Sequence, residues 1–186
     1  MPSSSTLSPK IIGILLIPVI LLVGLIAASY IYQPPTPDLL DMNLQKIGGT
    51  NVETTSFKGK VLVVEFFATW CDFCQETAQN IASVNQNYKL NNVQFLSVSI
   101  DPVHDNDKIL NNFIVDNNLT TYVGTNWFFT RDMTEQYTDY GVTNIPTTFL
   151  VSSNSIILER HLGLLNYNDI VSWLNNTQLV GPNILT

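Results

Sequence analysis

Two cysteines, Cys71 and Cys74, are the residues of this sequence whose type and spacing point most directly to chemistry. Two residues separate them, and they stand where an apolar run, Val61–Phe67, gives way to a stretch with helical spacing. The N-terminus of a helix offers free N–H groups and partial positive charge, which stabilise a thiolate. Cys71 is then the nucleophile that attacks a disulfide, and Cys74, about one helical turn further on, resolves the mixed disulfide. The pattern predicts a redox-active disulfide with no other cofactor.

Other uses of a cysteine pair stay open at this point. A purely structural bridge over three residues closes almost no loop and adds little stability. A zinc site needs about four ligands, and the two histidines, His104 and His161, are 57 residues apart. Metal delivery and inert thiols are further alternatives. We expect His161 to be an ordinary strand residue and His104 to lie in a solvated acidic loop with Asp101, Asp105 and Asp107, so no metal site is predicted.

The N-terminal part of the chain has the pattern of a membrane anchor. Residues 11–32 are 22 residues without a charge, which is long enough to cross a bilayer as a helix. Lys10 precedes this run and Asp38 follows it, so the positive-inside rule places residues 1–10 in the cytoplasm and the domain outside. The alternative is a signal peptide that is cleaved near Ala27–Ser29. The pattern favours a single-pass protein of the cell membrane with an extracytoplasmic domain.

Composition divides the rest of the chain and limits its partners. A proline-rich linker covers residues 33–37, one domain covers 38–176, and a tail covers 177–186. The whole chain of 186 residues has a formal net charge of −7. An acidic balance without a basic patch excludes nucleic acid as a partner. Asn118 and Asn175 begin glycosylation acceptor patterns, which match by chance often.

The apolar periodicity of the domain predicts alternating strands and helices. The expected strands are a hairpin over 42–55 around Gly48-Gly49, then 61–67, 93–100, a strand or loop at 127–129, and a hairpin of 147–151 with 156–162. The expected helices follow the cysteines, cover 107–117, include Met133, Tyr137 and Tyr140, and begin at an Asn168 cap. This order indicates an α/β fold, a mixed sheet with helices on both faces.

Two segments of the domain resemble the thioredoxin superfamily. Residues 64–74 resemble its strand and active-site segment, and residues 141–150 resemble its proline loop and following strand. Within the superfamily the chain is most similar to the membrane-anchored TlpA/ResA-like thiol–disulfide oxidoreductases. The resemblance implies a thioredoxin-like mixed sheet flanked by helices, with an N-terminal β-hairpin extension and an N-terminal transmembrane helix.

The resemblance also implies roles for four residues beside the cysteines. Glu65 occupies the position of a buried acid, where burial would raise its pKa and let it relay a proton to and from Cys74. Ile145–Pro146 matches a cis-proline loop whose backbone holds the substrate chain as an added strand. Trp70 would contact substrate at the rim of the site.

Partners and direction follow from the same resemblance and from the residues between the cysteines. The expected substrates are extracytoplasmic protein thiols or disulfides, such as those of apocytochromes or copper proteins, with a membrane electron donor and a monomeric protein. Asp72 next to Cys71 opposes stabilisation of its thiolate, and a less stabilised reduced form gives a more reducing couple. The sequence therefore favours a reductant.

The sequence departs from the family pattern at two places in the helix after the cysteines. Gln79 stands where the family usually has proline, so we expect this helix to lack a kink. Thr77 replaces the glutamate that is typical of ResA, with Glu76 one place earlier. Any role specific to that acid is therefore not expected here.

Two other functional classes share this fold. Copper-delivery proteins of the Sco type use Cys-x-x-x-Cys and a histidine near the proline loop, whereas this chain has two intervening residues and Asn144 before Ile145–Pro146. Peroxiredoxins need a proline and a threonine at the positions that Val64 and Ala68 hold here. The Sco type remains the alternative function.

Overall fold

The computed structural model describes residues 38–87, 90 and 92–176. The predicted tail 1–10, span 11–32, linker 33–37 and C-terminal tail 177–186 lie outside this part of the chain. Within the described part, no helix is both long enough and apolar enough to cross a membrane.

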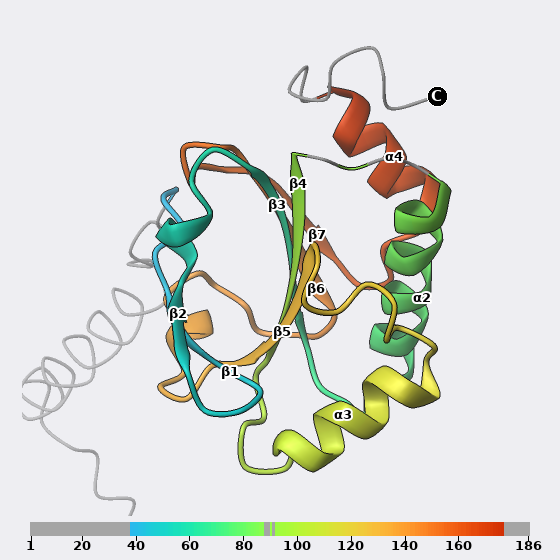
Figure 1. Cartoon of the computed structure of the whole chain (residues 1–186). Coiled ribbons are helices and arrows are strands. Elements are labelled where there is room, and N and C mark those ends of the chain that lie inside the picture. The colour runs from blue at the N-terminus through green and yellow to red at the C-terminus, as the bar shows by residue number, and fades with distance from the viewer. Residues whose placement is uncertain (1–37, 88–89, 91, 177–186) are drawn as a thin grey trace, which may run out of the picture. The chain divides into compact units, whose positions relative to one another are not determined.

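Seven strands form one mixed sheet in the order β2-β1-β5-β4-β3-β6-β7 (Figure 1). The strands are β1 Asn43–Lys46, β2 Asn51–Glu53, β3 Val61–Phe67, β4 Val93–Ser99, β5 Trp127–Arg131, β6 Thr147–Val151 and β7 Ile157–Leu162. The helices are α2 Asp72–Asn87, α3 Asp107–Asp116 and α4 Tyr167–Asn176. The predicted hairpins and long strands are thereby confirmed, and the turn between β1 and β2 uses Gly48 and Gly49 at positive φ, where glycine has no Cβ to clash.

Strand β3 lies in the interior of the sheet, next to the middle strand β4, and carries the chain directly into the cysteines. It pairs in parallel with β4 and antiparallel with β6, and every one of its seven residues is buried. An unbroken apolar run is what burial on both faces requires. Glu65 is the exception within this run, and its burial is therefore a feature of the site.

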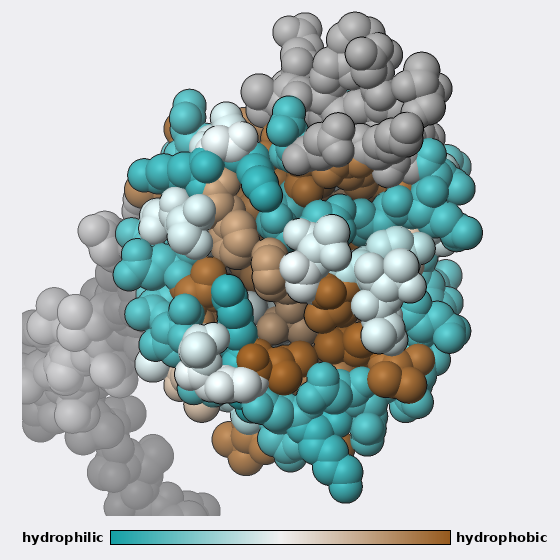
Figure 2. Space-filling model, in the orientation of Figure 1, coloured by the Kyte–Doolittle hydropathy of each residue, from teal (hydrophilic) through white to brown (hydrophobic). Residues whose placement is uncertain are grey.

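Helices α2, α3 and α4 all cover one face of the sheet, on the right in Figure 1. Their buried side chains join one apolar cluster with Val63 and Phe67 of β3. The other face is covered by the β1–β2 hairpin and by Tyr140 and Val142, which form a second cluster. The expectation of helices on both faces is therefore wrong. Figure 2 shows hydrophobic residues in the middle of the face in view and hydrophilic residues around them.

The helix expected around Met133, Tyr137 and Tyr140 is absent, which explains the one-sided arrangement. The segment holds only a 3-10 turn at Gln136–Thr138. The Asp132 carboxylate accepts hydrogen bonds from the backbone N–H groups of Thr134 and Tyr137, at 3.1 and 2.7 Å. A side chain that takes these donors competes with helical bonding, and the left-handed conformation of Glu135 (φ 59°) interrupts a right-handed helix.

Helix α4 begins two residues earlier than a cap at Asn168 allows. Its first residue is Tyr167, so Asn168 lies inside the first turn and is not the cap. The N–H of Asn166 instead donates to the Asp169 carboxylate at 3.3 Å, which is the reciprocal half of a capping box.

Candidate active site

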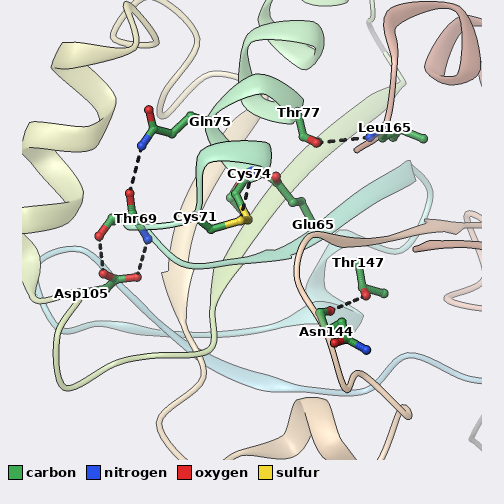
Figure 3. The surroundings of a disulfide bond; sticks show 11 residues. Glu65, Thr69, Cys71, Cys74, Gln75, Thr77, Asp105, Asn144, Thr147 and Leu165 are labelled. Carbon is green, nitrogen blue, oxygen red and sulfur yellow. Dashed lines mark hydrogen bonds between the residues drawn. A yellow bond between two sulfur atoms is a disulfide. The ribbon is translucent and has the colours of Figure 1, made fainter. Parts of the chain in front are cut away.

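Cys71 and Cys74 form a disulfide at the start of α2 (Figure 3). Cys71 precedes the first helical residue and is 8 % exposed, whereas Cys74 lies inside the helix and is fully buried. The backbone N–H of Cys74 donates to the Cys71 sulfur at 3.2 Å. An N–H donor at a helix N-terminus stabilises negative charge on that sulfur. The outer sulfur is therefore Cys71, and the geometry suits it as the attacking atom.

Helix α2 is continuous over 16 residues, as expected from Gln79 in place of proline. Thr77, at the position of the ResA-type glutamate, is fully buried. Its hydroxyl accepts a hydrogen bond from the backbone N–H of Leu165 at 3.3 Å, so this position ties α2 to the segment before α4 instead of supplying an acid.

Glu65 lies beneath the cysteines with 1 % of its surface exposed. Its carboxylate is directed toward Cys74 in Figure 3. The hydroxyl of Ser97 donates to Oε2 at 3.1 Å, and Oε1 has no hydrogen-bond partner among the described residues. Burial raises the pKa of Glu65 to about 8, and the hydrogen bond from Ser97 lowers it by a smaller amount. The expected buried acid is therefore present, and its raised pKa favours the protonated form near neutral pH.

The predicted proline loop lies where a substrate chain could reach the disulfide. The Ile145–Pro146 peptide bond is cis, as expected. Ile145 packs against the apolar cluster that contains both cysteines. The Thr147 hydroxyl donates to the carbonyl of Asn144 at 2.6 Å, which closes the loop on itself ahead of β6 (Figure 3).

Two aromatic side chains beside the disulfide are exposed. Trp70 is 58 % exposed, and Phe73, between the cysteines, is 62 % exposed. The indole N–H of Trp70 donates to the Asp101 carboxylate at 3.0 Å, which orients the ring. Large apolar side chains next to a reactive sulfur offer contact area to a partner. Trp70 was predicted for this role, and Phe73 was not.

The expectation that Asp105 lies in a solvated loop is wrong. Asp105 is fully buried, not solvated. Its carboxylate accepts hydrogen bonds from the backbone N–H and hydroxyl of Thr69 at 3.0 and 2.5 Å, from the Ser99 hydroxyl at 2.7 Å, and it contacts Nδ1 of His104 at 2.9 Å. Asp105 thus holds the residue two places before Cys71 (Figure 3). The aspartate cluster was the only sequence signal, and it suggested solvent instead of burial.

Within the described part of the chain, neither histidine belongs to a cluster of side chains that could bind a metal ion. His161 is on β7, opposite Thr148 of β6, and its Nε2 bonds with the carbonyl of Leu164. The pKa of His104 is raised, mainly by its hydrogen bond to Asp105. Within residues 38–87, 90 and 92–176, no group of three or more His, Cys, Asp or Glu side chains could hold a metal ion.

Comparison with known proteins gives one family and a consistent set of relatives. The model of the AhpC/TSA family matches residues 36–160. The thiol-disulfide oxidoreductase ResA of Bacillus subtilis is 25 % identical over 133 residues, 71 % of this chain and 69 % of that protein. The sporulation thiol-disulfide oxidoreductase A of the same species is 24 % identical over 141 residues, 76 % of this chain and 81 % of that protein.

Solved structures share the fold. The crystal structure of StoA from Bacillus subtilis matches with a TM-score of 0.59 and 21 % identity, covering 75 % of this chain and 98 % of that one. A thiol:disulfide interchange protein DsbE, described as putative, from Chlorobium tepidum matches with a TM-score of 0.61 and 21 % identity, covering 80 % of this chain and all of that one. At this identity the structures support the thioredoxin-like fold.

Proposed function

This chain belongs to the AhpC/TSA family, and we propose that it is a thiol–disulfide oxidoreductase that reduces disulfides of protein substrates. The observation that carries the proposal is the Cys71–Cys74 disulfide at the start of α2, in which Cys71 is 8 % exposed and Cys74 is fully buried. The ResA-type relatives have the same activity in their names. The peroxidase alternative lacks the proline and threonine that it needs, because Val64 and Ala68 hold those positions. The copper-delivery alternative lacks the three-residue spacing between the cysteines.

The residues supply each step of the exchange. In the reduced protein the Cys71 thiolate attacks one sulfur of the substrate disulfide, a Cys71–substrate bond forms, and the other substrate sulfur leaves as a thiolate. In the molecules in which Glu65 is ionised, Cys74 then loses its proton to the Glu65 carboxylate and attacks the Cys71 sulfur. The Cys71–Cys74 disulfide forms, and the second substrate thiolate leaves and takes a proton from water. Two electrons pass from the protein to the substrate.

The exposed rim would hold the substrate. An extended segment of the partner would lie against Trp70 and pair with the backbone of the loop at Ile145 and Pro146, as an added strand. Phe73 adds apolar contact area beside the sulfur. This arrangement fits a polypeptide, whose backbone offers hydrogen bonds at every residue.

The proposal also includes the direction of electron transfer and the location of the domain in the cell. Asp72 is exposed in the first turn of α2, and an acid there disfavours a thiolate on Cys71. We expect a midpoint potential nearer that of thioredoxin, about −270 mV, than that of DsbA, about −120 mV. The apolar run 11–32 would anchor the domain outside the cell membrane, where a membrane donor would keep it reduced and where apocytochromes or copper proteins would be substrates.

Insulin reduction and a trapping variant test the proposal. The protein should reduce insulin with dithiothreitol as donor, and Cys71→Ser should abolish this activity because the nucleophile is lost. Cys74→Ser should accumulate mixed disulfides on Cys71, since the resolving thiol is missing. Full insulin reduction by Cys71→Ser would refute the oxidoreductase function. A midpoint potential above about −180 mV, in the range of protein disulfide isomerase or higher, would refute the reductive direction alone.

A further inference from the structure

A row of polar side chains crosses the sheet from Glu65 to its outer edge. Glu65 of β3 lies directly opposite Thr148 of β6, and Thr148 lies directly opposite His161 of β7. Residues paired in this way point to the same face of a sheet with Cβ atoms about 5 Å apart. β7 is the strand at one edge of the sheet. The row therefore connects the acid beneath the disulfide with the edge of the sheet.

Two atoms of this row are buried without a hydrogen-bond partner among the described residues. They are Oε1 of Glu65 and Oγ1 of Thr148, and both residues are nearly or fully buried. An unpaired buried polar group costs about 1–3 kcal/mol. No direct hydrogen bond joins these two atoms, but one bridging water between the directly opposed residues would satisfy both. The polar atoms thus mark a connection between β3 and β6.

Hydrogen bonding on the other side of Glu65 decides which oxygen carries its proton. The indole N–H of Trp127 donates to the Ser97 hydroxyl at 2.9 Å, and that hydroxyl donates to Oε2 of Glu65. Because an indole N–H is only a donor, this chain of bonds has one direction. Oε2 receives a hydrogen, so the acid proton of Glu65 belongs on Oε1. That oxygen is the one without a partner.

At the other end of the row, the hydrogen bond of His161 leaves its Nδ1 as the ring atom that can accept a proton. Its Nε2 lies 2.9 Å from the carbonyl oxygen of Leu164. A carbonyl only accepts, so Nε2 carries hydrogen and Nδ1 of the neutral ring keeps its lone pair. The ring packs edge-on against Trp173 of α4, on the helical face, and it is partly exposed. An imidazole in this position can pass a proton to water.

No charged side chain from the helices competes for this proton. The buried residues of α2 and α4 are Cys74, Thr77, Ala78, Ile81, Val84, Ile170 and Leu174. Cys74 alone among them titrates. On the neighbouring strand β4, Ser97 faces Glu65, and the next residue on that face, Ser99, bonds with the separate carboxylate of Asp105.

We propose that Thr148 and His161 form the route by which the proton that Glu65 takes from Cys74 leaves the core. The proposal rests on the proposed exchange function. Glu65 gives the hydrogen on Oε1 through one bridging water to the Thr148 oxygen, while the Thr148 hydroxyl gives its own hydrogen through a second water to Nδ1 of His161, since neither pair is joined by a direct hydrogen bond. His161 then releases a proton to water. No electrons move, and the row returns to its starting state when the Thr148 hydroxyl rotates.

Infrared detection after a rapid pH jump measures this route directly. In the oxidised protein, the carbonyl band of protonated Glu65 is identified by its loss in Glu65→Gln, and its rate of change is followed after the jump. We expect Thr148→Val, which keeps shape but removes the hydroxyl, to slow this rate about tenfold or more. Thr148→Ser should restore it. His161→Gln, which keeps a donor for Leu164, should also slow it.

Thr130→Val is the matched control. Thr130 is a fully buried threonine of β5, bonded to the carbonyl of Ser97 and outside the row, so its rate should equal that of the wild type. A wild-type rate in both Thr148→Val and His161→Gln overturns the proposal, as does a Thr148→Ser rate as slow as that of Thr148→Val. Because the jump needs no substrate, absence of insulin reduction by the wild type would refute the proposed function separately.

Discussion

Replacing Glu65 by Gln should abolish a large pH dependence of stability. Burial raises the pKa of Glu65 to about 8 from its ordinary value of 4.5. The folded protein therefore holds this proton more tightly than the unfolded chain does. The resulting stability is fully present below pH 4.5 and is lost progressively as pH rises to about 8.

The size of the effect follows from that interval. Each unit between the two pKa values corresponds to about 1.4 kcal/mol, so ionising Glu65 removes about 5 kcal/mol of the free energy of unfolding between these limits. Domains of this kind have total stabilities of about 5–15 kcal/mol. A single buried carboxyl thus decides a large share of the stability at alkaline pH.

Urea denaturation of the oxidised proteins between pH 4 and pH 9 measures this contribution. Glutamine is shaped like protonated glutamic acid, and its amide oxygen can accept the hydrogen bond from Ser97. We expect the two proteins to have similar stability at pH 4 and Glu65→Gln to be more stable by about 5 kcal/mol at pH 9. Using the disulfide form keeps Cys74 from titrating.

An exposed glutamate on the same sheet gives the matched control. Glu159 of β7 is exposed, and Glu159→Gln should follow the wild-type pH dependence within about 0.5 kcal/mol. Parallel pH curves for the wild type and Glu65→Gln would refute the reasoning, because they would mean that water reaches the carboxyl in the folded protein.

Two further substitutions test the surroundings of the disulfide. Asp105→Asn places an amide nitrogen against donors that face a carboxylate oxygen in the wild type. We therefore expect urea denaturation to show a free energy of unfolding lower by about 3 kcal/mol, and we expect slower insulin reduction. Asp116→Asn, on the exposed side of α3, should change neither quantity. Asp72→Asn removes an exposed charge beside Cys71, and interactions of such charges contribute about 0.2–1 kcal/mol. A dithiothreitol titration should therefore show a midpoint potential higher by about 5–20 mV. A lower potential would contradict the assigned effect of Asp72.

The predictable part of this fold depends on neighbours in the sequence. The runs that form β3 and β4 are mostly apolar, with Glu65 as the polar residue of β3 and two serines and a glutamine in β4. A mostly apolar run of this length is typical of a strand that is buried on both faces. The Cys-x-x-Cys spacing likewise needs only one helical turn to bring two sulfurs together. Local pattern was therefore enough for the centre of the sheet and for the disulfide.

The structure of segment 132–142 was mispredicted because its local sequence pattern is compatible with two structures, a helix and the observed turn. Met133, Tyr137 and Tyr140 have helical spacing, but the Asp132 side chain takes two backbone donors at the point where a helix would begin. Tyr140 then packs in the cluster on the sheet face opposite the helices. A competing side-chain bond decided the outcome, and periodicity does not register such a bond.

Contacts between distant residues were beyond the sequence pattern. Asp105 meets Thr69 across 36 positions, and it does so because β3 and β4 run in parallel and both end at the same edge of the sheet. The row of Glu65, Thr148 and His161 depends on the register of β6 against both of its neighbours. A shift of one residue in either pairing would turn these side chains to opposite faces.

The two buried carboxylates of the site differ in how completely their oxygens are occupied, and this separates their roles. Asp105 has four side-chain hydrogen-bond contacts, three of them with Thr69 and Ser99, so both of its oxygens are fixed in place. Glu65 has one such partner, Ser97, and its second oxygen is unpaired within the described part of the chain. A saturated carboxylate positions the backbone ahead of Cys71, while a carboxyl with one free oxygen can gain and lose a proton without breaking a network. In the proposed mechanism the chain thus uses the same functional group twice within one site, once as a fixed support and once as a proton carrier.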